Sequence, residues 1–135
     1  MDIVPKPATR KAEGEHFTGD VYIDVIARHE TPESQVRVST VRFAPGARNA
    51  WHAHIKGQTF YVLEGRGRVQ SRGEEILEIR AGDVVYSAPG EWHWHGAAPE
   101  HFMSHLAMMD GAPPGQEDAE WGAPVTDEEY HGHAH

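Results

Sequence analysis

The sequence of 135 residues contains no cysteine and no long hydrophobic run. Without cysteine, the chain has neither disulfides nor thiolate metal ligands. No stretch approaches the roughly 20 apolar residues that a membrane-spanning helix needs, and the first residues lack the apolar segment of a secretion signal. We therefore expect a cytoplasmic protein without a membrane partner.

Positively charged residues are also scarce. The chain has 12 Lys and Arg against 21 Asp and Glu, which gives a formal net charge of -9 at pH 7. An acidic surface repels the phosphate backbone of DNA and RNA. The composition therefore excludes nucleic acid as an expected partner.

Glycine and proline, by contrast, are plentiful and scattered, with 14 and 9 copies. Short β-prone runs between such turn residues are typical of an all-β sandwich or barrel of the jelly-roll kind. A chain of this length forms one domain. We expect a single domain over residues 1–135, with its core at about 17–109, a loose arm at 1–15 and an irregular tail at 110–135.

The expected strands are separated by turns, one of which is placed at Glu64–Gly67, where two glycines follow each other closely. Each strand is short, as the spacing of the turn residues requires. The expected strands are Val21–Ala27, Val36–Ala44, Ala50–Ile55, Thr59–Leu63, Arg68–Ser71, Ile76–Ile79, Val84–Ser87, Trp92–Gly96 and Phe102–Met109.

The tail contains one helix signal. Thr126 and Glu129 have the spacing of a capping box, which predicts a short helix over Asp127–His131. A helix of this length is not stable alone. It has to pack on the barrel, and Tyr130 and Trp121 are the apolar side chains expected to anchor it.

Histidine is the most informative residue type in this chain. His52 and His54 are two residues apart in an expected strand, so both side chains point to the same face and can bind one ion. Gln58 adds a carbonyl oxygen shortly afterwards, and His93 brings another imidazole from a later strand. Imidazole and carbonyl donors of this kind predict a divalent metal ion held by His52, His54, Gln58 and His93.

All four predicted ligands are electrically neutral. They leave the full +2 charge on the ion, which makes it a stronger Lewis acid and favours anionic ligands. Mixed nitrogen and oxygen ligation suits manganese, iron, cobalt, nickel and zinc, and does not choose among them.

Strand alternation from the two histidines also predicts which side chains line the interior. The predicted lining is apolar around a polar centre, which is typical of a small-molecule site. On the second strand the alternation is ambiguous, and we favour its odd-numbered residues as inward. The predicted pocket residues are Ser39, Val41, Phe43, Phe60, Val62, Met103 and Met109.

Two further histidines are candidate catalytic residues. His105 is interpreted either as an acid–base group with a pKa near the operating range or as a core residue satisfied by a hydrogen bond. His95 is interpreted as a pocket residue beside the ligands. Trp92 and Trp94 alternate with the histidines and are expected to form a packing or subunit-contact surface.

The two histidine motifs resemble those of the cupin superfamily. The first motif of that superfamily usually ends in glutamate, where this chain has Gln58, and the second is matched from Gly82 to His93 with one extra residue before Pro89. The surrounding residues, including Val125–Tyr130 in the tail, are similar to small single-domain bacterial cupins with hydroxynitrile lyase activity.

This resemblance implies a cupin-type double-stranded β-helix. It implies one manganese ion per chain (or iron) on His52, His54, Gln58 and His93, with His105 as the free pocket histidine. It also implies cleavage or formation of cyanohydrins such as mandelonitrile, with the substrate oxygen on the metal and His105 moving a proton. Cupins generally pair through sheet edges, so a homodimer or homotetramer is expected.

Two other functions remain open at this point. A redox-active ion with free coordination positions can bind oxygen, so a dioxygenase that cleaves a C=C bond or a diketone fits the same ligands. A non-catalytic cupin that binds a small anion fits them as well.

Overall fold

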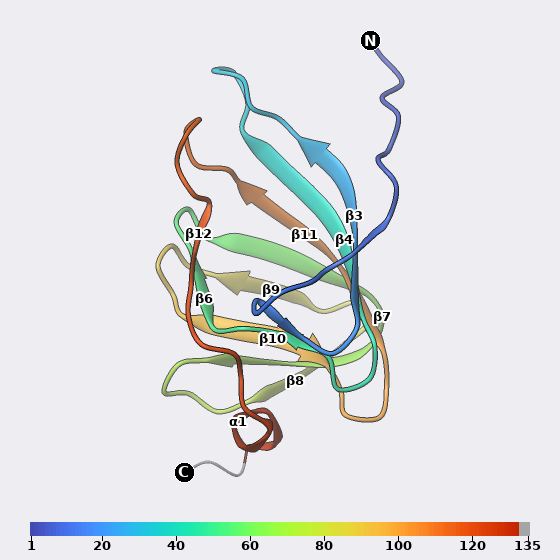
Figure 1. Cartoon of the computed structure of the whole chain (residues 1–135), viewed down its shortest axis with the longest axis vertical. Coiled ribbons are helices and arrows are strands. Elements are labelled where there is room, and N and C mark those ends of the chain that lie inside the picture. Colours follow the sequence, from blue (N-terminus) through green and yellow to red (C-terminus); the bar gives the residue numbers. More distant parts are fainter. Residues whose placement is uncertain (133–135) are drawn as a thin grey trace.

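The computed structural model describes residues 1–132 of the chain, so His133 and His135 of the expected tail lie outside the described residues. Twelve strands and one short helix make up the described part, as drawn in Figure 1. In chain order they are β1 Arg10–Lys11, β2 Phe17–Thr18, β3 Val21–Arg28, β4 Val36–Phe43, β5 Arg48–Asn49, β6 His52–His54, β7 Gln58–Ser71, β8 Leu77–Arg80, β9 Val84–Ser87, β10 His93–Ala97, β11 Met103–Asp110, β12 Ala119–Trp121 and α1 Asp127–His131.

The strands form an antiparallel jelly roll in which the sheet curls over on itself (Figure 1). One side is ordered β1-β3-β4-β11-β7-β9. The other contains β2-β5-β10-β7-β8, with β6 paired to β10 and β12 paired to β6. Strand β7 is shared, because its first half pairs with β11 and β9 and its second half with β10 and β8. The all-β jelly roll predicted from the turn spacing is confirmed.

The turn predicted at Glu64–Gly67 is wrong, because β7 runs through it as one strand of 14 residues. Gly65 has a φ of 84°, which an L side chain rarely adopts, and the chain bends there instead of reversing. At Gly67 a Cβ atom would lie 2.4 Å from the carbonyl oxygen of Gly96 on the neighbouring strand. The glycines therefore let β7 pass from one sheet to the other.

The ends of the chain are more ordered than the sequence predicts. Within the arm expected to be loose, β1 pairs with β3, and within the tail expected to be irregular, β12 pairs with β6. These strands have two and three residues. Strands so short carry no alternation that sequence reasoning can detect.

The helix α1 lies where the capping box predicts it. Thr126 accepts from the backbone of Glu129, and the Glu129 side chain accepts from the backbone of Thr126. Tyr130 is buried against Trp51, Trp94 and Val125 on the outer face of the barrel. Trp121 does not anchor the helix.

Trp94 is fully buried within the chain, so it cannot contribute to a subunit contact as expected. Its indole nitrogen donates to Gln70 at 2.9 Å, and its ring packs on Tyr130. The homodimer or homotetramer stays a prediction. No helix among the described residues is long and apolar enough to cross a membrane.

The N-terminal arm is tied to the barrel by Asp24, whose side chain is 12% exposed. Lys6 donates to it at 2.8 Å, Thr9 donates to the same oxygen, and Arg42 lies 3.2 Å away. The hydrogen bonds from Lys6 and Thr9, with the charges of Lys6 and Arg42, lower the pKa of Asp24 to about 2.

This cluster predicts an acid-dependent contribution to stability. A depressed carboxyl pKa stabilises the fold above its unfolded value of about 4, and this contribution is lost as the pH falls through about 2. Asp24→Asn should be less stable than the wild type at pH 7, with the difference shrinking between about pH 4 and 2. Urea unfolding across this range measures it, and a difference that does not depend on pH would contradict it.

Candidate metal centre and substrate cavity

Three segments bring the predicted ligands together. His52 and His54 lie on β6, and the turn at Gly57 returns the chain so that Gln58 begins β7. Gly57 has a φ of 79°, and a Cβ there would lie 2.8 Å from the carbonyl oxygen of Ser87. His93 begins β10 and pairs directly with His52 in the antiparallel register.

The imidazoles form a compact buried cluster. The ring centroid of His52 lies 4.9 Å from that of His54, 4.3 Å from that of His93 and 5.3 Å from that of His95. His52, His93 and His95 each offer one nitrogen within 4.8 Å of the others. This three-histidine cluster can hold a metal ion. His95, interpreted from the sequence as a pocket residue, therefore lies as close to the centre as the predicted ligands.

Backbone carbonyls set the orientation of two of the rings. His52 Nδ1 lies 2.8 Å from the carbonyl oxygen of Ala50, and His93 Nδ1 lies 2.8 Å from that of Glu91. A carbonyl only accepts, so each Nδ1 carries its hydrogen and each Nε2 keeps its lone pair. In His93 that Nε2 lies 3.3 Å from the hydroxyl of Ser87. A fixed tautomer with a free Nε2 is what a metal-binding histidine needs.

Two other predicted ligands carry buried polar atoms without a partner among residues 1–132. Both ring nitrogens of His54 and the side-chain oxygen of Gln58 make no hydrogen bond there. Leaving a buried polar atom unpaired costs about 1–3 kcal/mol, so such atoms usually have a partner. A divalent cation beside them would be that partner, and the donor set therefore fits a metal ion.

Burial keeps these imidazoles neutral. It lowers the pKa of His52 and of His95 well below the ordinary value and lowers that of His54 to about 4, with His93 nearby adding to the effect on His54. The pKa of His93 is lowered by burial as well. Neutral imidazole is the form that binds metal.

His105 and His95 form a second, deeper pair. His105 Nε2 lies 3.2 Å from His95 Nδ1, while His105 Nδ1 has no hydrogen-bond partner in the described chain. The ring of His105 stacks on Phe60 with centroids 4.3 Å apart. The side-chain oxygen of Asn49 accepts a hydrogen bond from the backbone N–H of His95. The Nδ2 atom of Asn49 lies 3.2 Å from each ring nitrogen of His95.

The pKa expected for His105 from the sequence was wrong. Complete burial lowers it to about 3, so the free imidazole is neutral at physiological pH. A neutral ring can accept a proton, and it holds that proton only when a negative charge lies nearby to compensate for the desolvation.

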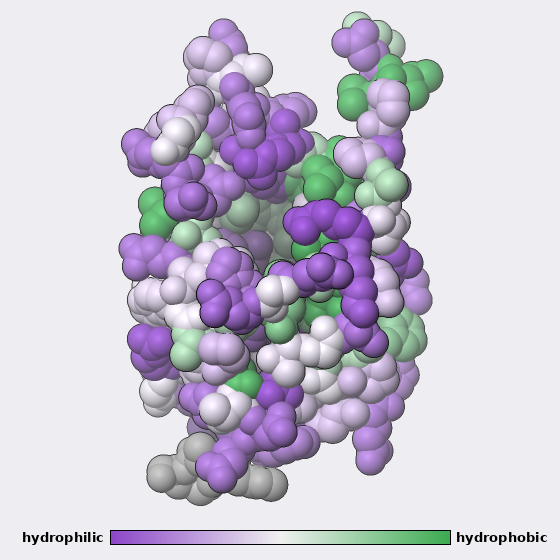
Figure 2. Space-filling view, in the orientation of Figure 1, coloured by the Kyte–Doolittle hydropathy of each residue, from purple (hydrophilic) through white to green (hydrophobic). Residues whose placement is uncertain are grey.

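All of these histidines except His93 line a cavity of about 220 Å³ that opens on one face. Figure 2 shows this face hollowed, with hydrophobic residues inside and hydrophilic residues around the rim. Ser39, Val41, Phe43 and Met109 line the cavity together with His52, His54, Gln58, His95 and His105. Three predicted pocket residues, Phe60, Val62 and Met103, do not line it and pack fully buried in the apolar core.

Sequence reasoning missed one wall of this cavity. Trp121, at the end of β12, lines it and is 39% exposed. Its ring stacks on His16 with centroids 4.1 Å apart and lies over His52 at 4.9 Å. β12 brings it there by pairing with β6, in which Trp121 is opposite His52. No local pattern indicated this pairing, because 69 positions separate the two residues in the printed numbering.

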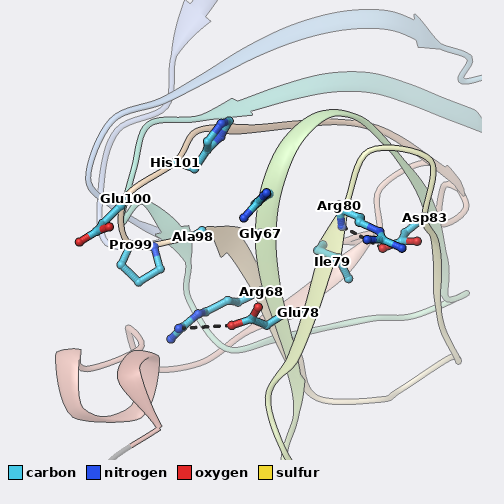
Figure 3. Close-up of a pocket in the computed structure, with 11 residues that line it drawn as sticks. Gly67, Arg68, Glu78, Ile79, Arg80, Asp83, Ala98, Pro99, Glu100 and His101 are labelled. Carbon is cyan, nitrogen blue, oxygen red and sulfur yellow. Dashed lines mark hydrogen bonds and ion pairs between the residues drawn. The ribbon is translucent and has the colours of Figure 1, made fainter.

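A second, larger cavity of about 920 Å³ shares no residue with the first. It lies between β7, β8 and the turn Ala98–His101, and Figure 3 shows its mixed charges, among them the ion pair of Arg68 with Glu78 at 3.7 Å. Its lining has one histidine, His101, and the carboxylates Glu78, Asp83 and Glu100, but these side chains form no metal-binding group among the described residues.

The fold is that of a known family. A family model described as the cupin domain matches residues 39–104, which span β6, Gln58 and His93. The chain belongs to the cupin family.

Particular relatives extend the likeness over nearly the whole chain. The chain is 44% identical over 130 residues to an (R)-mandelonitrile lyase of Granulicella tundricola, covering 94% of this chain and 95% of that protein. A cupin-like protein of Thermotoga maritima has a crystal structure with a TM-score of 0.84 and 36% identity, covering 98% of this chain and 96% of that one. A cupin 2 conserved barrel domain protein of Rhodopseudomonas palustris, at 18% identity and a TM-score of 0.69 over 90% of this chain and 79% of that one, shares the fold.

Proposed function

We propose that this protein is a metal-dependent lyase of the hydroxynitrile lyase type, which cleaves or forms cyanohydrins such as mandelonitrile. One observation carries the proposal: His54, Gln58 and His105 line the same cavity, and each has a buried polar atom without a hydrogen-bond partner among residues 1–132. That cavity thus combines donors for a cation with a group that accepts a proton. The similarity to an (R)-mandelonitrile lyase supports the reaction type.

His52, His54, Gln58 and His93 would hold the metal. The three histidines whose nitrogens lie within 4.8 Å of one another are His52, His93 and His95, so His95 is close enough to take the place of His54. We propose Mn²⁺, while Fe²⁺, Ni²⁺, Co²⁺ and Zn²⁺ suit the same donors. When bound, the ion supplies Lewis-acid stabilisation for negative charge that develops on the substrate. Neutral ligands leave its charge undiminished.

His105 moves the proton. Its imidazole accepts the hydroxyl proton of the cyanohydrin as the bond between the carbinol carbon and the nitrile carbon breaks. The electron pair of that bond leaves with cyanide, and the aldehyde remains. His105 then returns the proton to cyanide, which departs as HCN. The anion formed beside the ring offsets the cost of a buried imidazolium.

Apolar side chains orient the organic part of the substrate. Val41, Phe43 and Met109 line the cavity and exclude water from the reacting groups. Trp121 presents an aromatic ring on the same cavity wall. Because His16 and His52 stack on this ring, an aryl group would meet its edge and gain an edge-to-face contact that an alkyl group lacks.

Trp121 therefore predicts a preference for aromatic substrates. Trp121→Ala should raise KM for mandelonitrile about 3- to 10-fold and change KM for acetone cyanohydrin less, since an aromatic pair is worth about 0.5–1.5 kcal/mol. Steady-state kinetics with both substrates measure it, with Trp121→Phe as the variant that keeps an aromatic ring. Equal changes in KM for the two substrates would show that Trp121 makes no aromatic contact with the substrate.

The proposed function is tested by cyanide release. Purified protein with a measured metal content should release HCN from (R)-mandelonitrile faster than buffer alone, and EDTA should abolish the excess rate. No release above background at full metal content would refute the lyase. Metal-dependent oxygen uptake with a diketone, in place of cyanide release, would identify a dioxygenase instead.

A further inference from the structure

The rim of the substrate cavity carries arginines and no acidic side chain. Arg10, Arg28 and Arg37 line the cavity, and its lining contains no Asp or Glu. The chain as a whole has a formal net charge of -9 at pH 7. An acidic protein thus has a cavity whose ionised lining is positive, and this arrangement attracts anions.

Two of these arginines already have acidic partners beside the cavity. Arg28 Nε lies 2.8 Å from Glu30, and Arg37 Nε lies 3.3 Å from Asp118. Arg37 also donates to the carbonyl oxygen of His29, so its guanidinium is already held by hydrogen bonds within the protein. Arg10 differs, because no Asp or Glu among residues 1–132 forms an ion pair with it.

The backbone of β1 aims Arg10 at the cavity. Thr9 and Lys11, on either side of it, bind Asp24 and Asp20. Successive side chains of an extended strand alternate between its faces, so Arg10 points to the opposite face, where it is part of the cavity lining. Pairing with Ile23 on β3 holds its backbone in place.

We propose that the substrate of this cavity carries a carboxylate at the end away from the histidines, and that Arg10 binds it. Across the sheet, Ile23 and Val41 lie between Arg10 and His105, because Arg10 pairs with Ile23, Ile23 with Val41 and Val41 with His105. The lining therefore passes from the histidines through apolar side chains to one guanidinium without an acidic partner. Its volume of about 220 Å³ suits a small carboxylate better than a nucleotide. A guanidinium binds a carboxylate through two parallel charge-assisted hydrogen bonds.

This inference rests on the proposed function for the aldehyde or cyanohydrin end of the substrate, so it is tested by binding and not by turnover. Calorimetry on the purified protein compares benzaldehyde with 3- and 4-formylbenzoate at low salt. At least one formylbenzoate should bind about 10-fold more tightly than benzaldehyde, and Arg10→Gln should remove this difference while leaving benzaldehyde binding unchanged.

Lys11→Gln is the matched control, because Lys11 is the neighbouring exposed cation and pairs with Asp20 outside the cavity. It should keep the preference for the formylbenzoate. Raised salt should reduce the preference in the wild type, because exposed charges are screened. Equal affinities for the neutral and charged aldehydes, or a preference that survives in Arg10→Gln, would overturn the proposal even if mandelonitrile is cleaved. A preference that depends on Arg10 would uphold it even if no cyanide is released.

Discussion

Replacing His54 by leucine should weaken metal binding at least about 100-fold and leave the metal-free protein as stable as the wild type or more so. In the metal-free chain both nitrogens of His54 are buried without a hydrogen-bond partner in residues 1–132, and the side chain is 6% exposed. Unpaired polar atoms in that setting cost stability, about 1–3 kcal/mol, and leucine removes them while filling much of the space.

Two measurements separate the effects. Elemental analysis after dialysis against a defined metal solution gives the binding, and thermal unfolding with and without EDTA gives the stability. Metal at 100 times its dissociation constant stabilises the wild type by about 2.7 kcal/mol, and this increment should vanish in His54→Leu. His29→Leu is the control, since His29 is an exposed histidine outside the cavity. A His54→Leu variant that unfolds well below the wild type in EDTA would assign His54 a structural role.

Replacing His105 by alanine should lower kcat for cyanide release about 100-fold or more, with metal content unchanged and KM close to that of the wild type. The Nδ1 of His105 has no hydrogen-bond partner in the described chain, and its ring contacts His95, Phe43 and Phe60. Losing it removes the proton acceptor and leaves the predicted metal ligands in place.

His105→Gln guards against a folding defect, because glutamine keeps a polar side chain of similar size and cannot take the proton as imidazole does. Both variants should be slow. His101→Ala should retain full activity, since His101 is exposed and does not line the substrate cavity. Full activity in His105→Ala would leave His105 as a core residue and place the proton acceptor elsewhere.

The roles of His54 and His105 differ in how far the sequence alone predicts them. His54 was identified by its spacing from His52 alone, which places both rings on one face of a strand. The position of His105 next to His95 depends on β11 and β10 lying in sheets that face each other, and the spacing of ten residues does not predict that contact. The lowered pKa of His105 is likewise a property of the folded interior.

Two sequence predictions were wrong because a local pattern cannot show how distant strands pack. Alternation predicted Phe60, Val62 and Met103 as inward, and they do face inward, but the hollow of the barrel is filled with packed core there and open elsewhere. The glycines at 65 and 67 were interpreted as a turn because glycine marks a reversal and a bent strand equally well.

Local patterns were sufficient for the all-β class, the short helix at Asp127–His131 and the convergence of His52 and His54, because turn residues, capping boxes and strand alternation act over a few residues. The pairing of distant strands determined three other features of the site: the position of His95 in the histidine cluster, of Trp121 over His52, and of Arg10 at the rim. Such contacts join residues tens of positions apart, and their distances are set only when the strands pair and the barrel closes around its core.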